Sequence, residues 1–342
     1  MIRDETYAVL NDEALLREKE EIFKRLSLFY GGGHDGRTCN LDGYAFFPQV
    51  DPYAQPEKWM YAALDQMAQN VSLMSDKSKL RPLCVEMGFY GVHFVDKILG
   101  ADVFFQDGNW NAHYLETPVG ELAAPDFANN ETFLLAERLL NAFLQCGVKL
   151  PVFGLPTLAS PLNIALNLYG QEFLIALYTD PDAAKRDIRV ITDTIASLHR
   201  YYRGRLPEAQ LQPVVSWQRT QPYGYGQICG CSTQLVSDEI YREFFADADE
   251  EILNVYPHGG MIHLCGAHLQ HAEIFRGMKS LHALQLHNRA AQDLESYYEN
   301  LRDDQVIYLN CCEEMPYERA FDITKGRKII FVESGDPKEI VK

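Results

Sequence analysis

Short apolar runs alternate with helical patterns along most of this chain, and this alternation restricts the fold more than any other feature. The runs are rich in Val, Ile, Leu and Phe and are short, which is typical of buried parallel strands. They are Tyr44–Phe47, Leu83–Glu86, Val152–Leu155, Pro213–Trp217, Met261–Cys265, His282–Leu286, Val306–Leu309 and Lys328–Val332. Because consecutive parallel strands need a crossover helix, the alternation predicts an α/β fold. We expect a (β/α)8 TIM barrel, with an open doubly wound sheet as the alternative.

The helical pattern is clearest at Pro181–Tyr202, where apolar residues recur at three- and four-residue spacing. Asp180 is expected to cap its start, and Gly204 is expected to follow its end. Similar patterns predict helices over Asp238–Val255 and Ala290–Leu301. These helices supply the crossovers that the barrel requires.

The chain is long enough for one large core, with 342 residues of which 47% are hydrophobic. Since barrels of this kind often have about 250 residues or more, we expect one barrel domain over residues 1–342. An N-terminal extension over about residues 1–40 carries a helix near 11–28, followed by the glycine-rich stretch Gly31–Gly36. That stretch is interpreted as a loop, with phosphate binding as the alternative. An extra hairpin, Val103–Gln106 with His113–Leu115 around Gly108, is expected after the second strand–helix unit.

Composition and charge limit the partners, the location and the cysteine chemistry that we expect. The chain has 31 Lys and Arg against 48 Asp and Glu, a formal net charge of −17, which disfavours nucleic acid as a partner. The first residues lack the apolar core of a signal peptide, and no run of about 18 apolar residues follows. We therefore expect a cytoplasmic protein without a membrane span. Its eight cysteines are expected to be free thiols or metal ligands rather than disulfides.

Reactive side chains stand at the predicted carboxyl ends of the strands, where a barrel enzyme places its active site. They include Glu86, Trp217, Arg219, His263, Cys265, His287, Asn288, Asn310 and Cys311. We assign Glu86 and His287 to catalysis. The residues assigned to substrate binding are Trp217, Arg219, Asn288 and Asn310.

Glu86 ends an otherwise apolar strand, where a carboxylate is costly unless it is paired or used in proton chemistry. Trp217 and Arg219 have the side chains to stack on a substrate and grip it. The alternative for Arg219 is an ordinary ion pair with a nearby carboxylate.

His263 and Cys265 form the sharpest motif. Alternate residues of a strand point to one face, so the two side chains are expected to converge on one point. Imidazole and thiolate together suit Zn²⁺, and Cys311 is expected as a third ligand that leaves one position open for a substrate. The alternative is a buried small cysteine beside a core histidine.

Further cysteines and histidines surround this motif in the sequence. Cys229 and Cys231 are interpreted as free thiols in a loop, with metal binding as the alternative. His258 and His268 are expected either to orient His263 or to lie on the surface, and we favour the surface for His271.

Three segments resemble the uroporphyrinogen decarboxylase superfamily. They are Pro151–Ser160, Leu177–Pro181 with the long helix after it, and Ser232–Phe244 before the His263–Cys265 strand. The resemblance covers about residues 80–335, and it implies a (β/α)8 barrel. Barrels of this superfamily often pair, which implies a homodimer.

Uroporphyrinogen decarboxylases themselves carry an arginine-rich segment near the N-terminus that holds substrate carboxylates. They also carry an Asp after the second strand and a His near the last strand. The corresponding places in this chain hold Arg37 as the one arginine, Glu86, and the segment Ser334–Asp336. These departures and the acidic net charge argue against porphyrinogen decarboxylation.

The zinc- and corrinoid-dependent methyltransferases of the superfamily carry His-x-Cys and, much later, a second Cys. His263 and Cys265 match the first part of this pattern. The resemblance implies that they hold zinc with a third ligand. The candidates for that ligand are Cys311, which we favour, and Cys312, Glu333 and Asp336.

The expected function is zinc-dependent methyl transfer between a corrinoid and a thiol or similar small-molecule acceptor. The corrinoid would be carried by a separate protein that docks over the barrel mouth. One alternative is a metal-free decarboxylase of a tetrapyrrole or other small acid, with Glu86 and Arg219 as the working pair. A further alternative is a barrel that binds a corrinoid or porphyrin without turnover.

Overall fold

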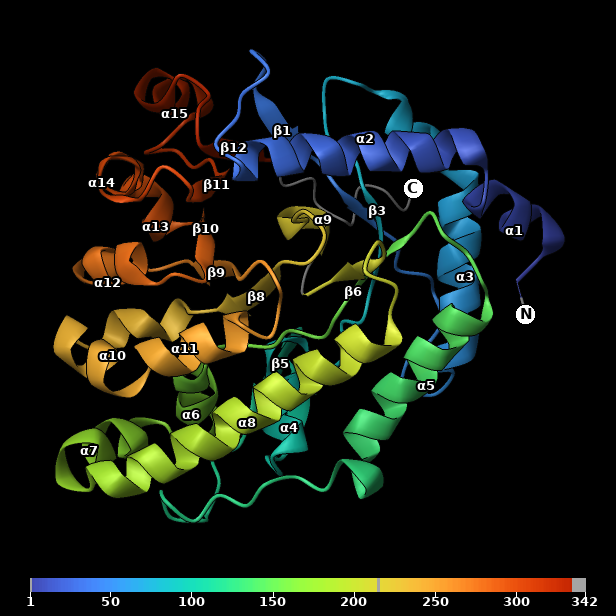
Figure 1. Cartoon of the computed structure of the whole chain (residues 1–342). Coiled ribbons are helices and arrows are strands. Elements are labelled where there is room, and N and C mark those ends of the chain that lie inside the picture. The colour runs from blue at the N-terminus through green and yellow to red at the C-terminus, as the bar shows by residue number, and fades with distance from the viewer. Residues whose placement is uncertain (1, 214–215, 334–342) are drawn as a thin grey trace.

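The computed structural model describes residues 2–213 and 216–333, and its centre consists of two parallel sheets. The larger sheet has the order β1-β12-β11-β10-β9-β8, and the smaller has the order β2-β3-β6-β7. Their strands are β1 (Cys39–Leu41), β2 (Tyr44–Ala45), β3 (Leu83–Glu86), β6 (Val152–Gly154), β7 (Leu211–Gln212), β8 (Gly226–Cys229), β9 (Gly260–Leu264), β10 (Leu281–Leu286), β11 (Val306–Asn310) and β12 (Ile329–Val332). Figure 1 shows these strands in the middle of the molecule with helices around them.

The helices lie mostly between consecutive strands in the sequence. They are α1 (Asp4–Leu10), α2 (Glu13–Tyr30), α3 (Pro56–Gln69), α4 (Phe94–Ile98), α5 (Glu131–Gln145), α6 (Pro161–Tyr169), α7 (Gln171–Thr179), α8 (Pro181–Arg205), α9 (Ser216–Arg219), α10 (Asp238–Phe244), α11 (Ala246–Leu253), α12 (Ala272–Gly277), α13 (Arg289–Gln292), α14 (Leu294–Asn300) and α15 (Tyr317–Thr324). Within the described ranges, none of them is long and apolar enough to cross a membrane.

The two sheets approach each other at both sides. The segment from Cys39 to Ala45 takes part in both, because β1 pairs with β12 and β2 pairs with β3. On the other side, Ala159 forms a single parallel bridge with Cys229. No ladder joins β7 to β8 in the part of the chain that the structure describes. The architecture is therefore parallel α/β and barrel-like, and a closed ring of eight strands stays a prediction.

Most of the predicted strands are present with ends shifted by one or two residues, and β3 has the predicted bounds. The strand predicted at Pro213–Trp217 is wrong: β7 ends at Gln212, and Ser216–Arg219 forms the short helix α9. Pro213 has no N–H to donate to a ladder, so the strand ends before it. Residues 214 and 215 lie outside the described residues. Two strands, β1 and β8, were not predicted.

Three other predictions differ in detail. The helix expected over 238–255 is divided into α10 and α11, and the helix expected over 290–301 into α13 and α14. Asp180 does cap α8 by accepting the N–H of Ala183, but Gly204 lies inside the last turn of that helix.

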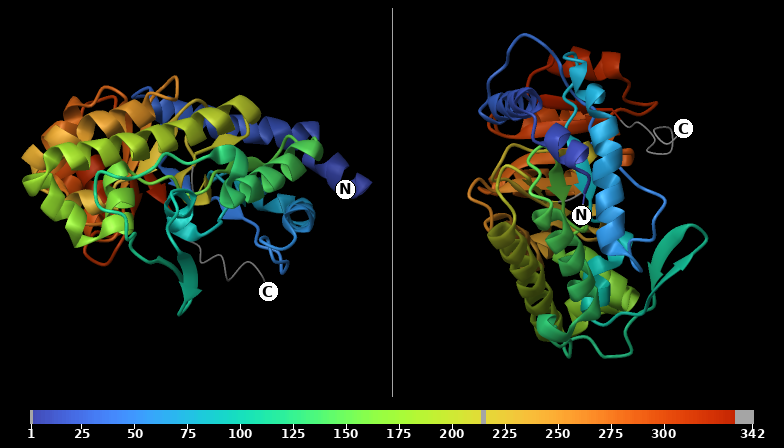
Figure 2. Two further views of the ribbon diagram at one scale, coloured as in Figure 1. Left: turned by 90° about the horizontal axis from the view of Figure 1, so that it is seen from below. Right: turned by 90° about the vertical axis from the view of Figure 1, so that its right-hand side faces the viewer.

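The extra hairpin consists of β4 (Val103–Gln106) and β5 (Asn109–Ala112), and it projects from the body of the molecule (Figure 2). The second strand begins earlier than the predicted His113–Leu115. Asp107 and Gly108 both have positive φ, 52° and 81°, so they form a tight two-residue turn. That turn pairs Gln106 directly with Asn109.

One face of the larger sheet is polar over three neighbouring strands. His263 on β9 is in register with Gln285 on β10, which is in register with Tyr308 on β11. Residues in register on parallel strands share a face of the sheet. All three side chains are buried, so this face carries hydrogen-bonding groups where a plain core would be apolar.

Candidate metal centre

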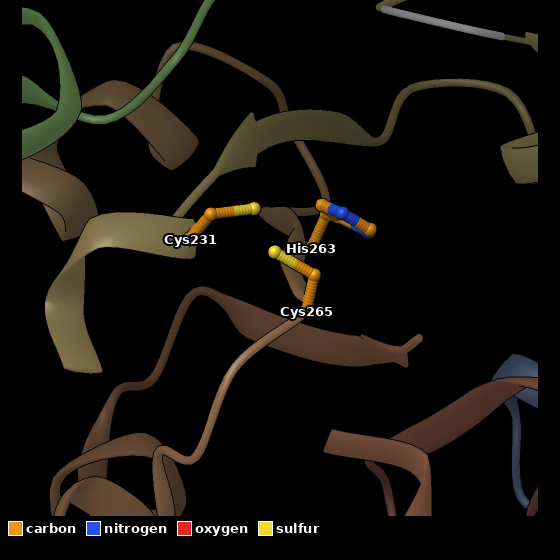
Figure 3. Close-up of side chains that lie close together, drawn as sticks. All are labelled: Cys231, His263 and Cys265. Carbon is orange, nitrogen blue, oxygen red and sulfur yellow. The ribbon is translucent and has the colours of Figure 1, made fainter. Parts of the chain in front are cut away.

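Three soft ligand atoms meet where β8 and β9 end. The sulfur atoms of Cys231 and Cys265 and a ring nitrogen of His263 all lie within 4.8 Å of one another (Figure 3). β8 and β9 are parallel neighbours with Cys229 opposite His263, so the residues just beyond both strand ends come together. His263 is buried and both cysteines are partly exposed, which leaves one side of the group accessible.

A chain of hydrogen bonds fixes the orientation and tautomer of His263. Gln285 donates from Nε2 to Oδ1 of Asn310 at 2.7 Å, so its Oε1 is the acceptor on the other side. That oxygen lies 2.8 Å from Nδ1 of His263, and Nδ1 must therefore carry the proton. Nε2 then keeps its lone pair, as a metal ligand requires. Burial and the nearby charge of Arg219 also hold the pKa of His263 well below its usual value, which keeps the ring neutral.

The two thiols act on each other. A hydrogen bond from Cys231 is the main cause that lowers the pKa of Cys265 to about 7, and the charge of Arg219 lowers it further. The same hydrogen bond, followed by burial, raises the pKa of Cys231. One sulfur is thus close to the thiolate form near neutral pH. A neutral imidazole and two thiolates are the donor set that Zn²⁺ prefers, and three protein ligands leave a fourth position for a substrate.

Arg219 adds a buried positive charge to the same region. Its Nη1 lies 3.4 Å from Sγ of Cys229, while its Nε is buried without a partner. The charge of Arg219 thus lies beside the cysteines of this centre. Its binding of a substrate and the alternative of an ion pair with a carboxylate both stay predictions.

Glu86 and Trp217 meet at α9, which lies between the two sheets (Figure 1). The N–H of Trp217 donates to Oε1 of Glu86 at 3.2 Å, and its carbonyl accepts the N–H of Gly43 at 3.2 Å. A Cβ at position 43 would lie 2.4 Å from that carbonyl oxygen, so this close approach requires glycine. Glu86 therefore anchors α9, and its catalytic role stays a prediction.

The structure brings His287 and Asn310 near the centre as well. The rings of His287 and His263 are 6.0 Å apart, and Asn310 is linked to His263 through Gln285. Asn288, next to His287, has φ 48° and ψ −123°, a backbone conformation that is strained for a residue other than glycine. Their roles in catalysis and substrate binding stay predictions.

The favoured third ligand from the sequence does not join the cluster. Cys311 is exposed, and it follows Asn310, so it points away from the face that carries His263. β11 is also separated from β9 by β10, which places its end about 10 Å away. Among the alternatives, Cys312 lies in the same loop and Glu333 forms an ion pair with Lys79, while Asp336 lies outside the described residues.

Cys231 supplies the third ligand atom of the cluster in place of Cys311, although the sequence favours free thiols in its loop. β8 is not apolar enough to be predicted as a strand, so the sequence does not show that Cys231, two residues after its end, lies next to β9. His271 was expected on the surface and is buried, as is His268, whereas His258 is exposed. Burial lowers the pKa of His268 to about 4, so this ring is neutral as well.

Among solved structures, the chain is similar to a methyltransferase from Methanosarcina mazei. The TM-score is 0.62 at 11% sequence identity, over 91% of each chain. At this identity the likeness shows a shared fold. No family model matches the chain, and no curated protein matches it in sequence.

Proposed function

We propose that this chain is a zinc-dependent methyltransferase that moves a methyl group between a corrinoid and a thiol or similar small acceptor. The observation that carries the proposal is the group of Cys231, His263 and Cys265 at neighbouring strand ends. The fold shared with a methyltransferase supports it. In this proposal Cys231 replaces Cys311 as the third ligand.

The residues around the group suit this chemistry. Zinc bound there would hold the acceptor thiol and lower its pKa. Gln285 keeps Nε2 of His263 available, and His287, half-buried beside His263, is placed to accept the proton that the thiol releases. The buried guanidinium of Arg219, whose Nε has no hydrogen-bond partner, favours an acceptor that carries an anionic group.

The proposal also extends to the setting of the site. It places the chain with the zinc- and corrinoid-dependent methyltransferases of the uroporphyrinogen decarboxylase superfamily. It includes a closed (β/α)8 barrel, a cytoplasmic location and a separate corrinoid protein that docks over the strand ends. Pairing into a homodimer belongs to the same proposal.

Elemental analysis of purified protein tests the metal centre first. Wild type is expected to hold about one zinc per chain, because three protein ligands are the usual set of a catalytic zinc site. Cys231→Ala and Cys265→Ala should lose it. Cys311→Ala is the matched control and should keep it. Zinc that persists in Cys231→Ala but not in Cys311→Ala would overturn the ligand set.

Methyl transfer is then measured directly, with methylcobalamin as donor and a small thiol that carries an acid group as acceptor. Wild type should demethylate the corrinoid in a thiol-dependent reaction, and His263→Ala should not. If wild type instead held no stoichiometric zinc and released carbon dioxide from uroporphyrinogen, that result would support the metal-free decarboxylase. Glu86 and Arg219 would then be the residues to change next.

A further inference from the structure

The two sulfur ligands lie on loops that no strand pairing holds together. The last backbone hydrogen bond between the segments runs from the N–H of Gly230 to the carbonyl of His263, at 2.9 Å. Beyond it, Cys231 begins a turn of 3-10 helix over Cys231–Leu235, and Cys265 enters the loop before α12. Among the described residues, no backbone hydrogen bond joins these two loops. Beyond the strand ends, the hydrogen bonds between the two loops therefore involve side chains.

The imidazole of His268 joins the two loops. Its Nδ1 lies 2.8 Å from Oγ1 of Thr233 in the Cys231 loop, and its Nε2 accepts the N–H of Gly266, next to Cys265, at 3.0 Å. The hydroxyl of Thr233 in turn lies 2.9 Å from the carbonyl of Gly230.

These contacts leave one assignment of protons. A carbonyl oxygen only accepts, so the single hydroxyl proton of Thr233 goes to Gly230. The hydroxyl then accepts from Nδ1–H of His268, and Nε2 is left bare for the N–H of Gly266. Thr233 and His268 are both fully buried, so each of these bonds is made without competition from water.

Two more side-chain contacts join the same loops. His271 lies with Nε2 at 2.8 Å from the carbonyl of Thr233, and Oε1 of Gln234 accepts the N–H of Ala267 at 3.3 Å. Gly266 is packed so closely against Gln234 that a Cβ on it would lie 1.9 Å from that oxygen. The loop of Cys265 therefore packs closely against the loop of Cys231, at the residues that follow each cysteine.

We propose that Thr233 and His268 are positioning residues that set the separation of the two sulfur ligands, Cys231 and Cys265. This inference rests on the metal centre of the proposed function. The bonds of His268 end one residue from Cys265 and two residues from Cys231. A change in these bonds therefore moves one sulfur relative to the other while the strands that carry His263 stay paired.

Three substitutions separate this role from a general contribution to stability. Thr233→Val keeps the shape of the side chain but removes the hydroxyl, which leaves Nδ1–H of His268 without its acceptor. Thr233→Ser restores the hydroxyl. Tyr256→Phe is the matched control, because it removes the hydroxyl that lies 2.9 Å from Nδ1 of another buried histidine, His199. That pair packs near Gly226, at the opposite end of β8 from Cys229.

The readouts are the dissociation constant for Zn²⁺ and the absorption spectrum with Co²⁺ as a probe of tetrahedral sulfur ligation, both measured on the full chain. Thr233→Val is expected to bind zinc about 10- to 100-fold more weakly, the usual effect of removing a group that orients metal ligands, and to show altered Co²⁺ bands. Thr233→Ser should stay within about twofold of wild type, since it keeps the hydrogen-bonding group. Tyr256→Phe should lower the melting temperature without changing zinc affinity.

Should Thr233→Val fail to fold, Gln234→Ala serves in its place, because that side chain is exposed and its loss should weaken zinc binding by only about threefold. Wild-type zinc affinity and Co²⁺ bands in a folded Thr233→Val protein would overturn the positioning role while leaving the metal centre intact. Wild type that binds neither metal would refute the proposed function itself, and the two failures are distinguished in this way.

Discussion

The bond between His263 and Gln285 makes the sharpest prediction about the metal centre. In Gln285→Leu, Nδ1–H of His263 loses the acceptor that lies at 2.8 Å, and Asn310 loses a donor at 2.7 Å. Because Gln285 is fully buried, water cannot replace either bond. Leaving such groups unpaired costs about 1–3 kcal/mol of stability. The freed imidazole is no longer held in one orientation and one tautomer, which should weaken metal binding about 10- to 100-fold.

The assay is a competition between the protein and a chelator of known zinc affinity, and unfolding in urea is measured on the same samples. Gln305→Leu is the control, because Gln305 is equally buried and its amide donates to the carbonyls of Phe275 and Leu281, away from the metal centre. Both variants should lose stability, but only Gln285→Leu should lose zinc affinity. Equal zinc affinity in wild type and Gln285→Leu would refute the reasoning that Gln285 orients the histidine.

Three further predictions concern single residues. Cys231→Ser should lose most of its zinc in a dialysis assay because a hydroxyl is a poor zinc ligand; full retention would remove Cys231 from the ligand set. Burial raises the folded-state pKa of Asp249 to about 7, so wild-type stability should fall, by up to about 4 kcal/mol, as pH rises from about 4 to about 7. Asp249→Asn keeps an acceptor for the Tyr241 hydroxyl and should remove that fall in urea titrations; an unchanged pH slope would contradict the assignment. Asn288→Gly should raise the unfolding free energy by about 1 kcal/mol, since glycine relieves the strained backbone, and a loss of stability would contradict the strain.

The sequence predicts the strands whose residues are apolar and misses those whose residues are not. β12 consists of Ile, Phe and Val, and β3 and β11 are hydrophobic except for their last residues, Glu86 and Asn310, so all three stand out from their surroundings. β8 reads Gly-Gln-Ile-Cys, with one strongly apolar residue, because its Gln227 faces the same polar interior as His263. Tertiary pairing with β9, rather than local preference, makes this segment a strand.

The metal centre, like the strands, is predicted only in part, because part of it depends on which strands are neighbours. His263 lies on β9 and Cys265 directly follows the end of that strand, two residues later, so their convergence is predicted from strand geometry. Cys231 reaches them from a different strand, and its place depends on which strands are neighbours. Spacing in the sequence carries no such information for Cys231 or Cys311. The order β8-β9-β10-β11 decides between them.

That order also determines which groups remain for a substrate. With Cys231 as third ligand, all three ligands come from the adjacent ends of β8 and β9. The ends of β10 and β11, with His287 and Asn310, then face the centre without being taken up as ligands. A ligand from the end of β11 would have closed that side. A ligand set confined to two strands would therefore leave the ends of β10 and β11 free for a substrate, and two of the four residues predicted to bind it, Asn288 and Asn310, lie there.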